Sequence, residues 1–207
     1  SLPARGNSLR VLDVGCAGGY LSELLARRGY RVTGVESAVH AVQNFPETVE
    51  LVHADLDSGL PPGLGSFDYV ICADVLEHLR RPEPFLRELH SVLTANGRLV
   101  ASLPNSGHWY FRWNVLMGRF PQHDRGLFDR THLHFYTWQG WVQLFAAAGF
   151  TIEQARSSGI PAGEALPRWR DRWLVRLAER LSFESARIWK TACAYQFIVV
   201  ARPEEGR

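Results

Sequence analysis

Apolar residues follow two alternating patterns along the first hundred residues. Short continuous apolar runs predict buried strands, and apolar spacings of three and four residues predict helices that cover them. The runs occur at residues 10–14, 31–35, 49–52, 67–73 and 98–103. Helical spacings occur between them at residues 20–28 and 82–93, and Pro82 suits a first helical turn. This alternation predicts an α/β fold, a three-layer sandwich with a doubly wound, mostly parallel sheet.

The second half of the chain is less regular. Residues 137–148 have helical spacing and are followed by Gly149, a residue typical of helix ends. Residues 150–154 and 195–201 predict two further strands. Residues 104–136 contain aromatics, histidines and arginines without a clear period. We interpret this stretch as a functional insertion above the edge of the sheet.

The composition is that of an ordinary globular protein. Of the 207 residues, 46% are hydrophobic and 21% are charged, which excludes a disordered chain and suits one domain. No apolar run reaches the roughly 18 residues of a transmembrane helix, and no secretory signal is visible. With 23 basic and 21 acidic residues the net charge is +2, which does not indicate nucleic-acid binding.

Cysteine and lysine usage adds an expectation about the source. The three cysteines form no CxxC pair, which is typical of free thiols in a reducing cytoplasm and argues against a zinc site. Lys190 is the one lysine among the 23 basic residues, which we interpret as codon bias of a GC-rich genome. We therefore expect a cytoplasmic, bacterial protein with a single domain over residues 1–207.

The sharpest chemical signal is the glycine-rich turn DVGCAGG at residues 13–19, between the first predicted strand and the first helix. In doubly wound sheets, ligands bind at this place, and glycines let the backbone approach them. The GxGxxG pattern of dinucleotide sites is absent. Asp13 would repel a pyrophosphate, but it suits a ligand with an ammonium group.

Acidic residues also end the next two predicted strands. Glu36 is placed to accept hydrogen bonds from ribose hydroxyls, and Asp55 falls near an adenine position. Three acids at three neighbouring strand ends suit a cationic nucleoside better than a diphosphate.

These motifs resemble those of the class I S-adenosylmethionine-dependent methyltransferases. The resemblance covers residues 9–103, including the segment FDYVICADVLEH at residues 67–78. It implies a seven-stranded sheet whose antiparallel last strand lies beside the fifth, with S-adenosyl-L-methionine as cofactor. The implied cofactor-binding residues are Asp13, Gly15, Cys16, Ala17, Gly19, Glu36, Asp55, Leu56 and Asp74. Ala17 replaces the glycine of many relatives, and we expect its methyl group to be tolerated.

The segment after the fourth strand carries the candidate catalytic base. Methyl transfer is an in-line displacement in which the protein aligns the reactants and takes up the acceptor proton. His78 is the first candidate, because imidazole titrates near neutral pH. Alternatively, Glu77 and His78 pair with each other or with the backbone and only shape the loop. The Asp-x-x-Glu-His pattern also resembles a magnesium-binding cluster of some ubiquinone-pathway and small-RNA methyltransferases, but Asp74 is shorter than the glutamate there, and we expect no metal.

Residues 104–136 resemble the acceptor-side wall of small-molecule methyltransferases related to a methionine-biosynthesis accessory protein and to glycan and metabolite enzymes. His132 and His134 alternate with Leu133 and Phe135, so the two histidines are expected to share one face. They would bind acceptor hydroxyls or carboxylates and are further catalytic candidates. The alternative is that both are packing residues.

Residues 157–190 are predicted to form a basic, aromatic helical lid. A helix at residues 164–181 places four apolar residues on one stripe beside a row of arginines: Trp169, Trp173, Leu177 and Leu181. We favour tryptophans that pack on the core, with the arginines in water. The alternatives are binding of an anionic acceptor and contact with a membrane surface near a lipid-linked substrate.

The predicted function is S-adenosylmethionine-dependent methyl transfer to a small molecule, most simply at oxygen. No Asn/Asp-Pro-Pro-Tyr motif follows the fourth strand, which argues against transfer to adenine N6. Two alternatives stay open. One is an accessory protein that binds the cofactor without catalysing or depends on a partner, and the other is an NAD-dependent oxidoreductase. The acceptor and the oligomeric state are not predicted.

Overall fold

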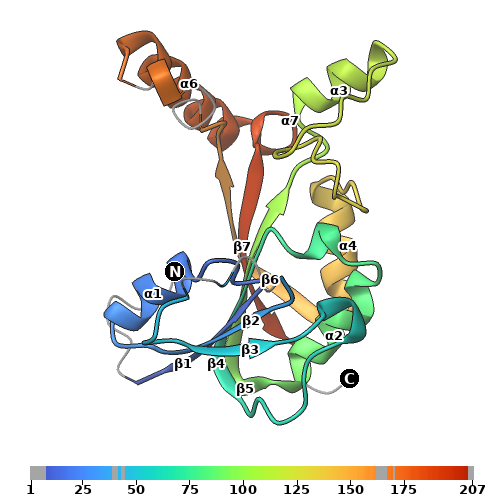
Figure 1. Ribbon diagram of the computed structural model, residues 1–207. Helices are drawn as coiled ribbons and strands as arrows, with labels where there is room; N and C mark the ends of the chain where they lie inside the picture. Colours follow the sequence, from blue (N-terminus) through green and yellow to red (C-terminus); the bar gives the residue numbers. More distant parts are fainter. Residues whose placement is uncertain (1–7, 39–41, 43–44, 162–166, 170, 205–207) are drawn as a thin grey trace.

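The computed structural model describes residues 8–38, 42, 45–161, 167–169 and 171–204. One sheet contains seven strands in the order β3-β2-β1-β4-β5-β7-β6 (Figure 1). The strands are β1 (Arg10–Val14), β2 (Arg31–Glu36), β3 (Glu50–His53), β4 (Phe67–Ala73), β5 (Leu93–Pro104), β6 (Phe150–Ser158) and β7 (Gln196–Pro203). Neighbours from β3 to β5 are parallel, whereas β7 is antiparallel to both β5 and β6. The predicted fold class and the place of the last strand are confirmed.

Helices cover both faces of the sheet. The helices α2 (Pro82–Ser91) and α4 (Trp138–Ala147) pack on one face, and α1 (Tyr20–Arg27) packs on the other. Thr137 caps α4, as its hydroxyl accepts a hydrogen bond from the N–H of Gly140. Short 3₁₀ turns follow β3 and β4, namely η2 (Leu56–Ser58) and η3 (Leu76–His78). The result is the three-layer arrangement that the alternation predicts.

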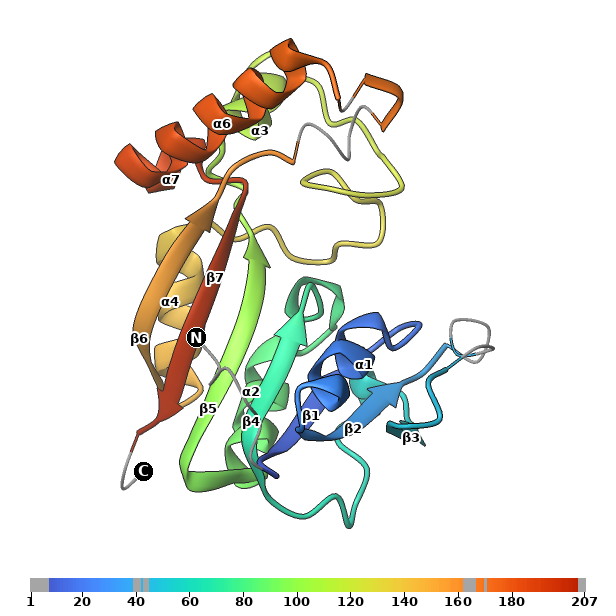
Figure 2. The ribbon, with the colours of Figure 1, turned by 90° about the vertical axis from the view of Figure 1, so that its left-hand side faces the viewer.

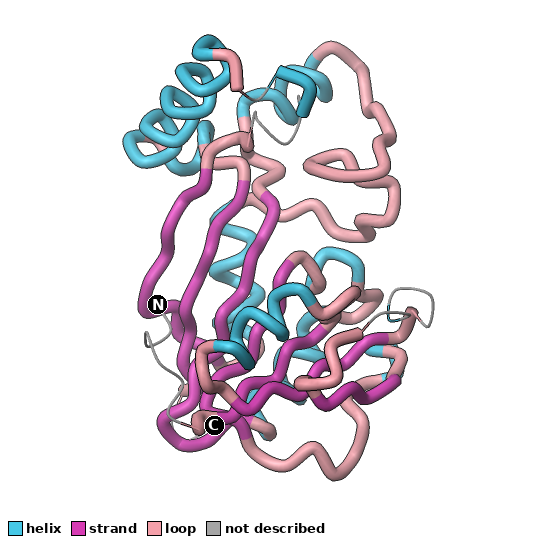
Figure 3. Tube along the Cα trace, turned by 60° about the vertical axis from the view of Figure 1, so that its left-hand side comes forward, coloured by secondary structure: helices cyan, strands magenta, loops and turns pink. Residues whose placement is uncertain are grey.

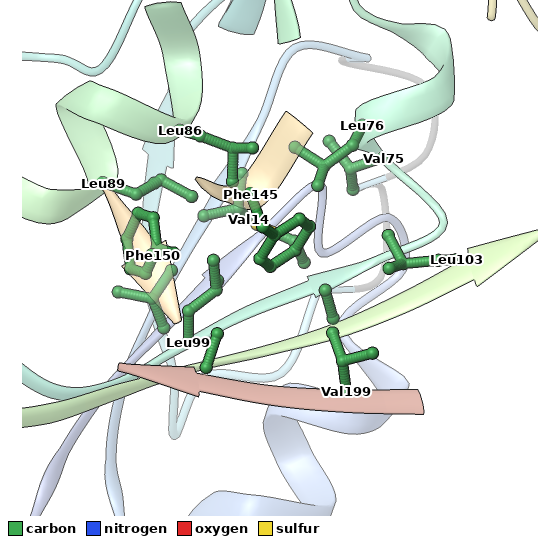
Figure 4. Close-up of a cluster of buried hydrophobic side chains, with 14 of the residues drawn as sticks. Val14, Val75, Leu76, Leu86, Leu89, Leu99, Leu103, Phe145, Phe150 and Val199 are labelled. Carbon is green, nitrogen blue, oxygen red and sulfur yellow. The ribbon is translucent and has the colours of Figure 1, made fainter. Parts of the chain in front are cut away.

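The larger core lies between the sheet and the α2–α4 layer (Figure 4). Alternate residues of the strands, such as Leu99 and Leu103, meet Leu86 of α2 and Phe145 of α4 there. Trp141 is fully buried beside them, and its indole N–H donates to the carbonyl of Pro104 at 2.8 Å. Burial of large apolar side chains therefore holds β5 and α4 together at the place where β5 ends.

Two boundaries in the middle of the chain differ from the prediction. Helix α2 ends at Ser91, and β5 begins at Leu93, so Asn96 and Gly97 lie inside the strand. The β4–β5 pairing is irregular there, which accommodates the extra residues. Residues 104–136 also contain a helix that the prediction omits, α3 (Trp109–Leu116). Its sequence shows no period because apolar residues occur on both its buried and its exposed sides.

The prediction that the tryptophans of residues 157–190 pack on the core is wrong. The main helix of this segment is α6 (Trp173–Ile188), preceded by η4 (Pro167–Trp169) and followed by α7 (Lys190–Cys193). Trp169 and Trp173 are 53% and 70% exposed. Helix α6 instead buries the small residues Val175 and Ala186. The reason is close approach, because a Cβ on Gly159 would lie 2.5 Å from the backbone nitrogen of Phe183.

The long strands β5, β6 and β7 extend beyond the rest of the sheet and carry α3, α6 and α7 at their far end (Figures 1 and 3). The segment between α3 and α4 passes above the end of β4 (Figure 2). Within the part of the chain that the structure describes, no helix is both long enough and apolar enough to cross a membrane.

Candidate active site

The glycine turn lies at the carboxyl end of β1. Gly15 has a φ of 67°, and the N–H groups of Gly15 and Cys16 both donate to the carbonyl of Val35, at 2.8 and 3.2 Å. A Cβ on Gly15 would lie 2.7 Å from the Cγ2 of Val75. The turn is therefore tied to β2 on one side and touches the segment after β4 on the other.

The rest of the turn leads into α1. Gly19 has a φ of 75° and precedes the helix, and a Cβ there would lie 2.6 Å from the Phe45 ring. Ala17 has a φ of 46°, a left-handed conformation that strains a side chain. Cys16 is buried, and burial raises the pKa of its thiol to about 12. The side chain of Cys16 is thus packed inside the protein.

The Glu36 carboxylate accepts hydrogen bonds from three backbone N–H groups. Its Oε2 accepts from Ala17 at 2.9 Å, and its Oε1 accepts from Ser37 and Ala38 at 2.8 and 2.9 Å. The carboxylate therefore joins the end of β2 to the glycine turn. Since a carboxylate oxygen accepts two hydrogen bonds, Oε2 retains capacity for a hydroxyl. This placement agrees with the predicted ribose contact, which remains a prediction.

Asp13 is buried below the turn. It is 2% exposed, and its Oδ2 accepts from the hydroxyl of Ser22 at 2.5 Å. Burial raises the pKa of Asp13 to about 6, although the hydrogen bond from Ser22 opposes the shift. A cationic group above the turn would offset that burial and favour the ionised carboxylate.

The remaining predicted cofactor residues follow β3 and β4. Asp55 caps η2, since its carboxylate accepts from the N–H of Asp57 at 3.1 Å, and Leu56 packs against the main core. Asp74 has a φ of 54° and accepts from the Ser102 hydroxyl and the Gln196 amide at 3.1 and 2.8 Å. Asp74 thus joins the ends of β4, β5 and β7 at the edge where the turn lies.

These residues fit a cationic nucleoside. The side chains of Val75 and Phe45 leave no room for a Cβ at Gly15 or Gly19, and acids stand at the ends of β1, β2 and β4. A diphosphate would meet like charge at each of these ends. The sulfonium and ammonium groups of S-adenosylmethionine would meet opposite charge.

A second set of side chains meets at the end of β4. One potential ligand atom from each of Glu77, His78 and His132 lies within 4.8 Å of the other two. Glu77 is fully buried, and neither of its carboxylate oxygens has a hydrogen-bond partner among the residues that the structure describes. Burial raises the pKa of Glu77 to about 8. Among the described residues, the ion-pair contact of the Glu77 carboxylate is with Nε2 of His132, at 3.9 Å, and no ion pair joins Glu77 to His78.

His78 is oriented by residues of the 104–136 segment. Its Nδ1 lies 3.2 Å from the carbonyl oxygen and 3.1 Å from the hydroxyl of Thr131. That hydroxyl donates to Asp129 at 2.6 Å, so both Thr131 oxygens act as acceptors towards His78. Nδ1 therefore carries the ring proton, and Nε2 is the basic nitrogen. Burial alone would raise the pKa of Asp129, but the hydrogen bonds from Thr131 lower it.

His132 and His134 lie on one side of an extended segment, as predicted, while Leu133 and Phe135 are exposed. Their surroundings differ. The ring centroids of His132 and His78 are 4.7 Å apart, whereas His134 stacks on Tyr136. Burial lowers the pKa of His132, and the neighbouring His78 lowers it further. The structure thus brings His132, but not His134, to the candidate base.

A pocket of about 340 Å³ opens beside this cluster. It is lined by Asp74, Glu77, His78, Pro104, Arg125, Gly126, Leu127, Asp129, His132, Pro161, Tyr195 and Gln196. Sequence reasoning missed Arg125, Asp129 and Tyr195 as site residues. Asp129 and Thr131 follow no spacing that connects them to His78, which lies 53 residues from Thr131 in sequence.

The fold and the glycine turn with its acids define a class I, Rossmann-like, S-adenosylmethionine-dependent methyltransferase. Comparisons with known proteins agree. A family model described as a methyltransferase domain matches residues 2–155. The chain therefore belongs to the methyltransferase-domain family.

The individual relatives share about a third or less of their aligned residues with this chain. A ubiquinone biosynthesis O-methyltransferase of Psychrobacter arcticus is 31% identical over 153 residues, which is 69% of this chain and 59% of that protein. The chain thus spans less than two thirds of this curated relative. A solved methyltransferase of Mesorhizobium loti has a TM-score of 0.64 at 19% identity, with 97% of this chain and 93% of that chain covered. A Burkholderia thailandensis N1-methyltransferase solved with S-adenosylhomocysteine has a TM-score of 0.59 at 18% identity, with 96% and 72% covered.

Proposed function

We propose that this chain transfers a methyl group from S-adenosylmethionine to a hydroxyl oxygen of a small-molecule acceptor. The observation that carries the proposal is the oriented His78, whose Nδ1 is held by Thr131 and whose ring lines a pocket. The segment after β4 that carries His78 also touches the glycine turn, through Val75. The pocket volume, about 340 Å³, suits a small molecule. The relative from Psychrobacter arcticus, named as an O-methyltransferase, supports oxygen as the acceptor atom.

When bound, S-adenosylmethionine supplies a methyl group on a sulfonium, which is already activated for displacement. The residues of the chain supply alignment and a base. In the proposed reaction the oxygen–carbon bond would form as the carbon–sulfur bond breaks, and Nε2 of His78 would take the hydroxyl proton. Asp129 stabilises the resulting imidazolium through Thr131. His132 stays neutral beside it, because its pKa is lowered.

The proposal extends to an acceptor with an anionic group. Arg125 lines the pocket with His78, on the side of the 104–136 segment. A guanidinium group binds carboxylates and phosphates with paired hydrogen bonds. Arg125→Gln should therefore raise the KM for an anionic acceptor while leaving the affinity for the cofactor unchanged. An unchanged KM would remove Arg125 from acceptor binding.

The first experiment is calorimetric titration with S-adenosylhomocysteine, with NAD as the parallel control. Binding of S-adenosylhomocysteine alone is expected. Binding of NAD alone would overturn the proposal in favour of an oxidoreductase, which the family membership does not favour. Binding of neither would favour an accessory protein with a vestigial site.

Turnover of His78 variants then tests the mechanism. His78→Ala should lower kcat by about 10²–10⁴-fold, the usual contribution of a general base. Its affinity for S-adenosylhomocysteine should not change. His134→Ala is the matched control, since His134 lies on the same segment as His132 but outside the lining of the pocket. Normal turnover of His78→Ala in a folded protein would leave His78 with a role in loop shape alone.

A divalent cation is a second candidate for this cluster, and one observation favours it. The buried Glu77 carboxylate has no hydrogen-bond partner among the described residues and lies within reach of His78 and His132. Glu77, His78 and His132 would hold the cation, which would polarise the acceptor oxygen. Turnover after treatment with a chelator separates the two mechanisms. Unchanged turnover supports the base alone, and a loss restored by Mg²⁺ but not in Glu77→Gln supports the cation.

A further inference from the structure

The end of the molecule that carries α3 and α6 exposes its large apolar residues. On α6 the apolar stripe consists of Trp173, Leu177, Leu181 and Ile188, which recur at helical spacing on one side. All are exposed, Trp173 at 70% and Ile188 at 87%. The buried residues Val175 and Ala186 lie on the side that packs on β6. The stripe is thus turned away from the protein.

Helix α3 repeats this arrangement. Trp109, Arg112, Trp113 and Leu116 are separated by three and four residues, and they line a groove of about 690 Å³ together with Trp189, Ala192 and Cys193. The buried residues of α3, Phe111 and Asn114, lie on its other side. Because Trp189 follows Ile188 directly, the groove adjoins the end of the α6 stripe. We call these two exposed faces and the groove the α3–α6 surface.

The charge of the α3–α6 surface is strongly positive. Residues 167–190 contain seven basic and three acidic residues, and residues 105–119 contain Arg112 and Arg119 but no acid. The net charge of the whole chain is only +2, so the cationic excess is concentrated here. On α6, Arg176, Arg180 and Arg187 border the apolar stripe along one side at helical spacing.

We propose that the α3–α6 surface docks on an anionic lipid bilayer. Tryptophan prefers the boundary between headgroups and acyl chains, and arginine binds lipid phosphates. An exposed apolar stripe bordered by arginines is the pattern of helices that lie in this boundary. The surface potential of anionic lipids attracts the cationic segments. A second copy of the chain is disfavoured as the occupant, because two cationic surfaces would face each other.

Docking would leave the β1–β3 edge of the sheet in water and place the acceptor pocket on the side towards the lipid. Pro104, Tyr195 and Gln196 line that pocket at the ends of β5 and β7, and these strands lead into α3 and α7. In Figure 1, α3 and α6 lie at one end of the molecule and the β1–β3 edge lies towards the other. An amphiphilic acceptor could thus reach the pocket from the bilayer side. The docking itself does not depend on the proposed reaction.

Vesicle flotation with the whole chain tests the proposal. Vesicles of phosphatidylcholine and phosphatidylglycerol in equal parts should carry the protein, and pure phosphatidylcholine vesicles should not. High salt should weaken the binding, because the arginines contribute through screened charges. Binding to both kinds of vesicle with no salt dependence would contradict the assignment of anionic lipid.

Two sets of variants test whether the α3–α6 surface is the part of the protein that binds the vesicles. Trp113→Ala and Trp173→Ala should each weaken vesicle binding about tenfold, as expected when one large apolar side chain no longer leaves water. The matched control is Tyr20→Ala, an exposed aromatic on α1. Arg176→Gln with Arg180→Gln should weaken binding about thirtyfold, because two cations near the anionic surface are lost. Arg28→Gln, which follows α1, is the control.

Affinity for S-adenosylhomocysteine shows that each variant is folded. If the wild-type chain binds S-adenosylhomocysteine but not anionic vesicles, the docking proposal fails and the proposed reaction stands. Vesicle binding that the tryptophan and arginine variants leave unchanged would also overturn it. If the chain instead dimerises and Trp113→Ala abolishes the dimer, the α3–α6 surface is a protein interface and the lipid assignment is wrong.

Discussion

The two ends of the molecule differ in whether their large apolar residues are buried or exposed. At the carboxyl ends of β1–β4, valines, leucines and phenylalanines are buried, and polar groups such as Glu36 hold neighbouring backbone. At the α3–α6 surface, tryptophans and leucines are exposed, and valine and alanine are buried. Both ends are rich in apolar residues, so composition alone does not tell which will be inside. Burial depends on the surfaces that the neighbouring elements offer.

The physical reason lies in the layers. The parallel strands have a helix layer on each face, so a continuous apolar run is covered on both sides. Helix α6 packs on the end of β6 and on α7, through small residues close to Gly159. The opposite side of α6 meets no layer among the described residues. A large exposed apolar patch of this kind is typical of a binding surface.

Replacement of one tryptophan at each end tests this contrast most strongly. Trp141→Ala should lower the free energy of unfolding by about 3–5 kcal/mol, because it removes a buried indole that also bonds Pro104. Trp173→Ala should lower it by less than about 0.5 kcal/mol, because the side chain is already in water. Urea denaturation measures both. Similar losses for the two variants would mean that α6 is covered in solution.

The buried Asp13 and an exposed acid should differ in how they make the stability of the fold depend on pH. The pKa of Asp13 is about 6 in the folded protein, above its value of 3.8 in the unfolded chain. The folded state thus binds the proton more tightly, so stability from Asp13 is full below pH 3.8 and is lost as the pH rises through about 6. Asp13→Asn should remove a cost of about 3 kcal/mol at pH 8 but weaken cofactor binding.

Urea denaturation at pH 4 and pH 8 measures this difference. The control is Glu184→Gln, an exposed acid on α6 that should leave the pH dependence unchanged. Equal stability of Asp13→Asn and the wild type at pH 8 would show that Asp13 is ionised without cost, and its environment would then be more polar than the structure indicates.

At the ligand end, Glu36→Ala should weaken binding of S-adenosylhomocysteine by about 1–3 kcal/mol, the usual loss for a charge-assisted hydrogen bond. The substitution also frees three backbone N–H groups, so unfolding must be measured in parallel. Glu50→Ala on β3 is the control, since Glu50 bonds Thr33 and is not a predicted ligand residue. Unchanged affinity in folded Glu36→Ala would remove the ribose assignment.

The smallest effect concerns the strained turn. Ala17→Gly should raise the free energy of unfolding by about 1 kcal/mol, because glycine adopts the left-handed conformation without a Cβ clash. Ala26→Gly, inside α1, should have the opposite sign and a similar size. Thermal unfolding of the two variants checks the pair. A loss of stability in Ala17→Gly would mean that the Ala17 methyl makes a packing contact that outweighs the strain.

Much of the catalytic end could be predicted because its signals are local. Strand β4 could be recognised from seven consecutive residues, and the glycine turn with Asp13 lies within one short segment. Glu36 and Asp55 could be added because parallel strands bring their carboxyl ends to one edge. The relay from Asp129 through Thr131 to His78 could not be predicted, because it joins residues far apart in sequence and no period connects them.

The pattern of apolar residues was sufficient for the α/β class and its mostly parallel sheet. The resemblance of the local motifs to class I methyltransferases supplied the place of the last strand and the cofactor class, and the role of His78 remains a prediction. The folded arrangement was needed to show that His132 joins His78 while His134 does not, and that the apolar stripe of α6 with Trp173 faces outward. An amphipathic helix has two sides, and its sequence alone does not state which one meets the protein. Here the close approach of Gly159 admits only the side with Val175 and Ala186, so the tryptophans are left in the solvent.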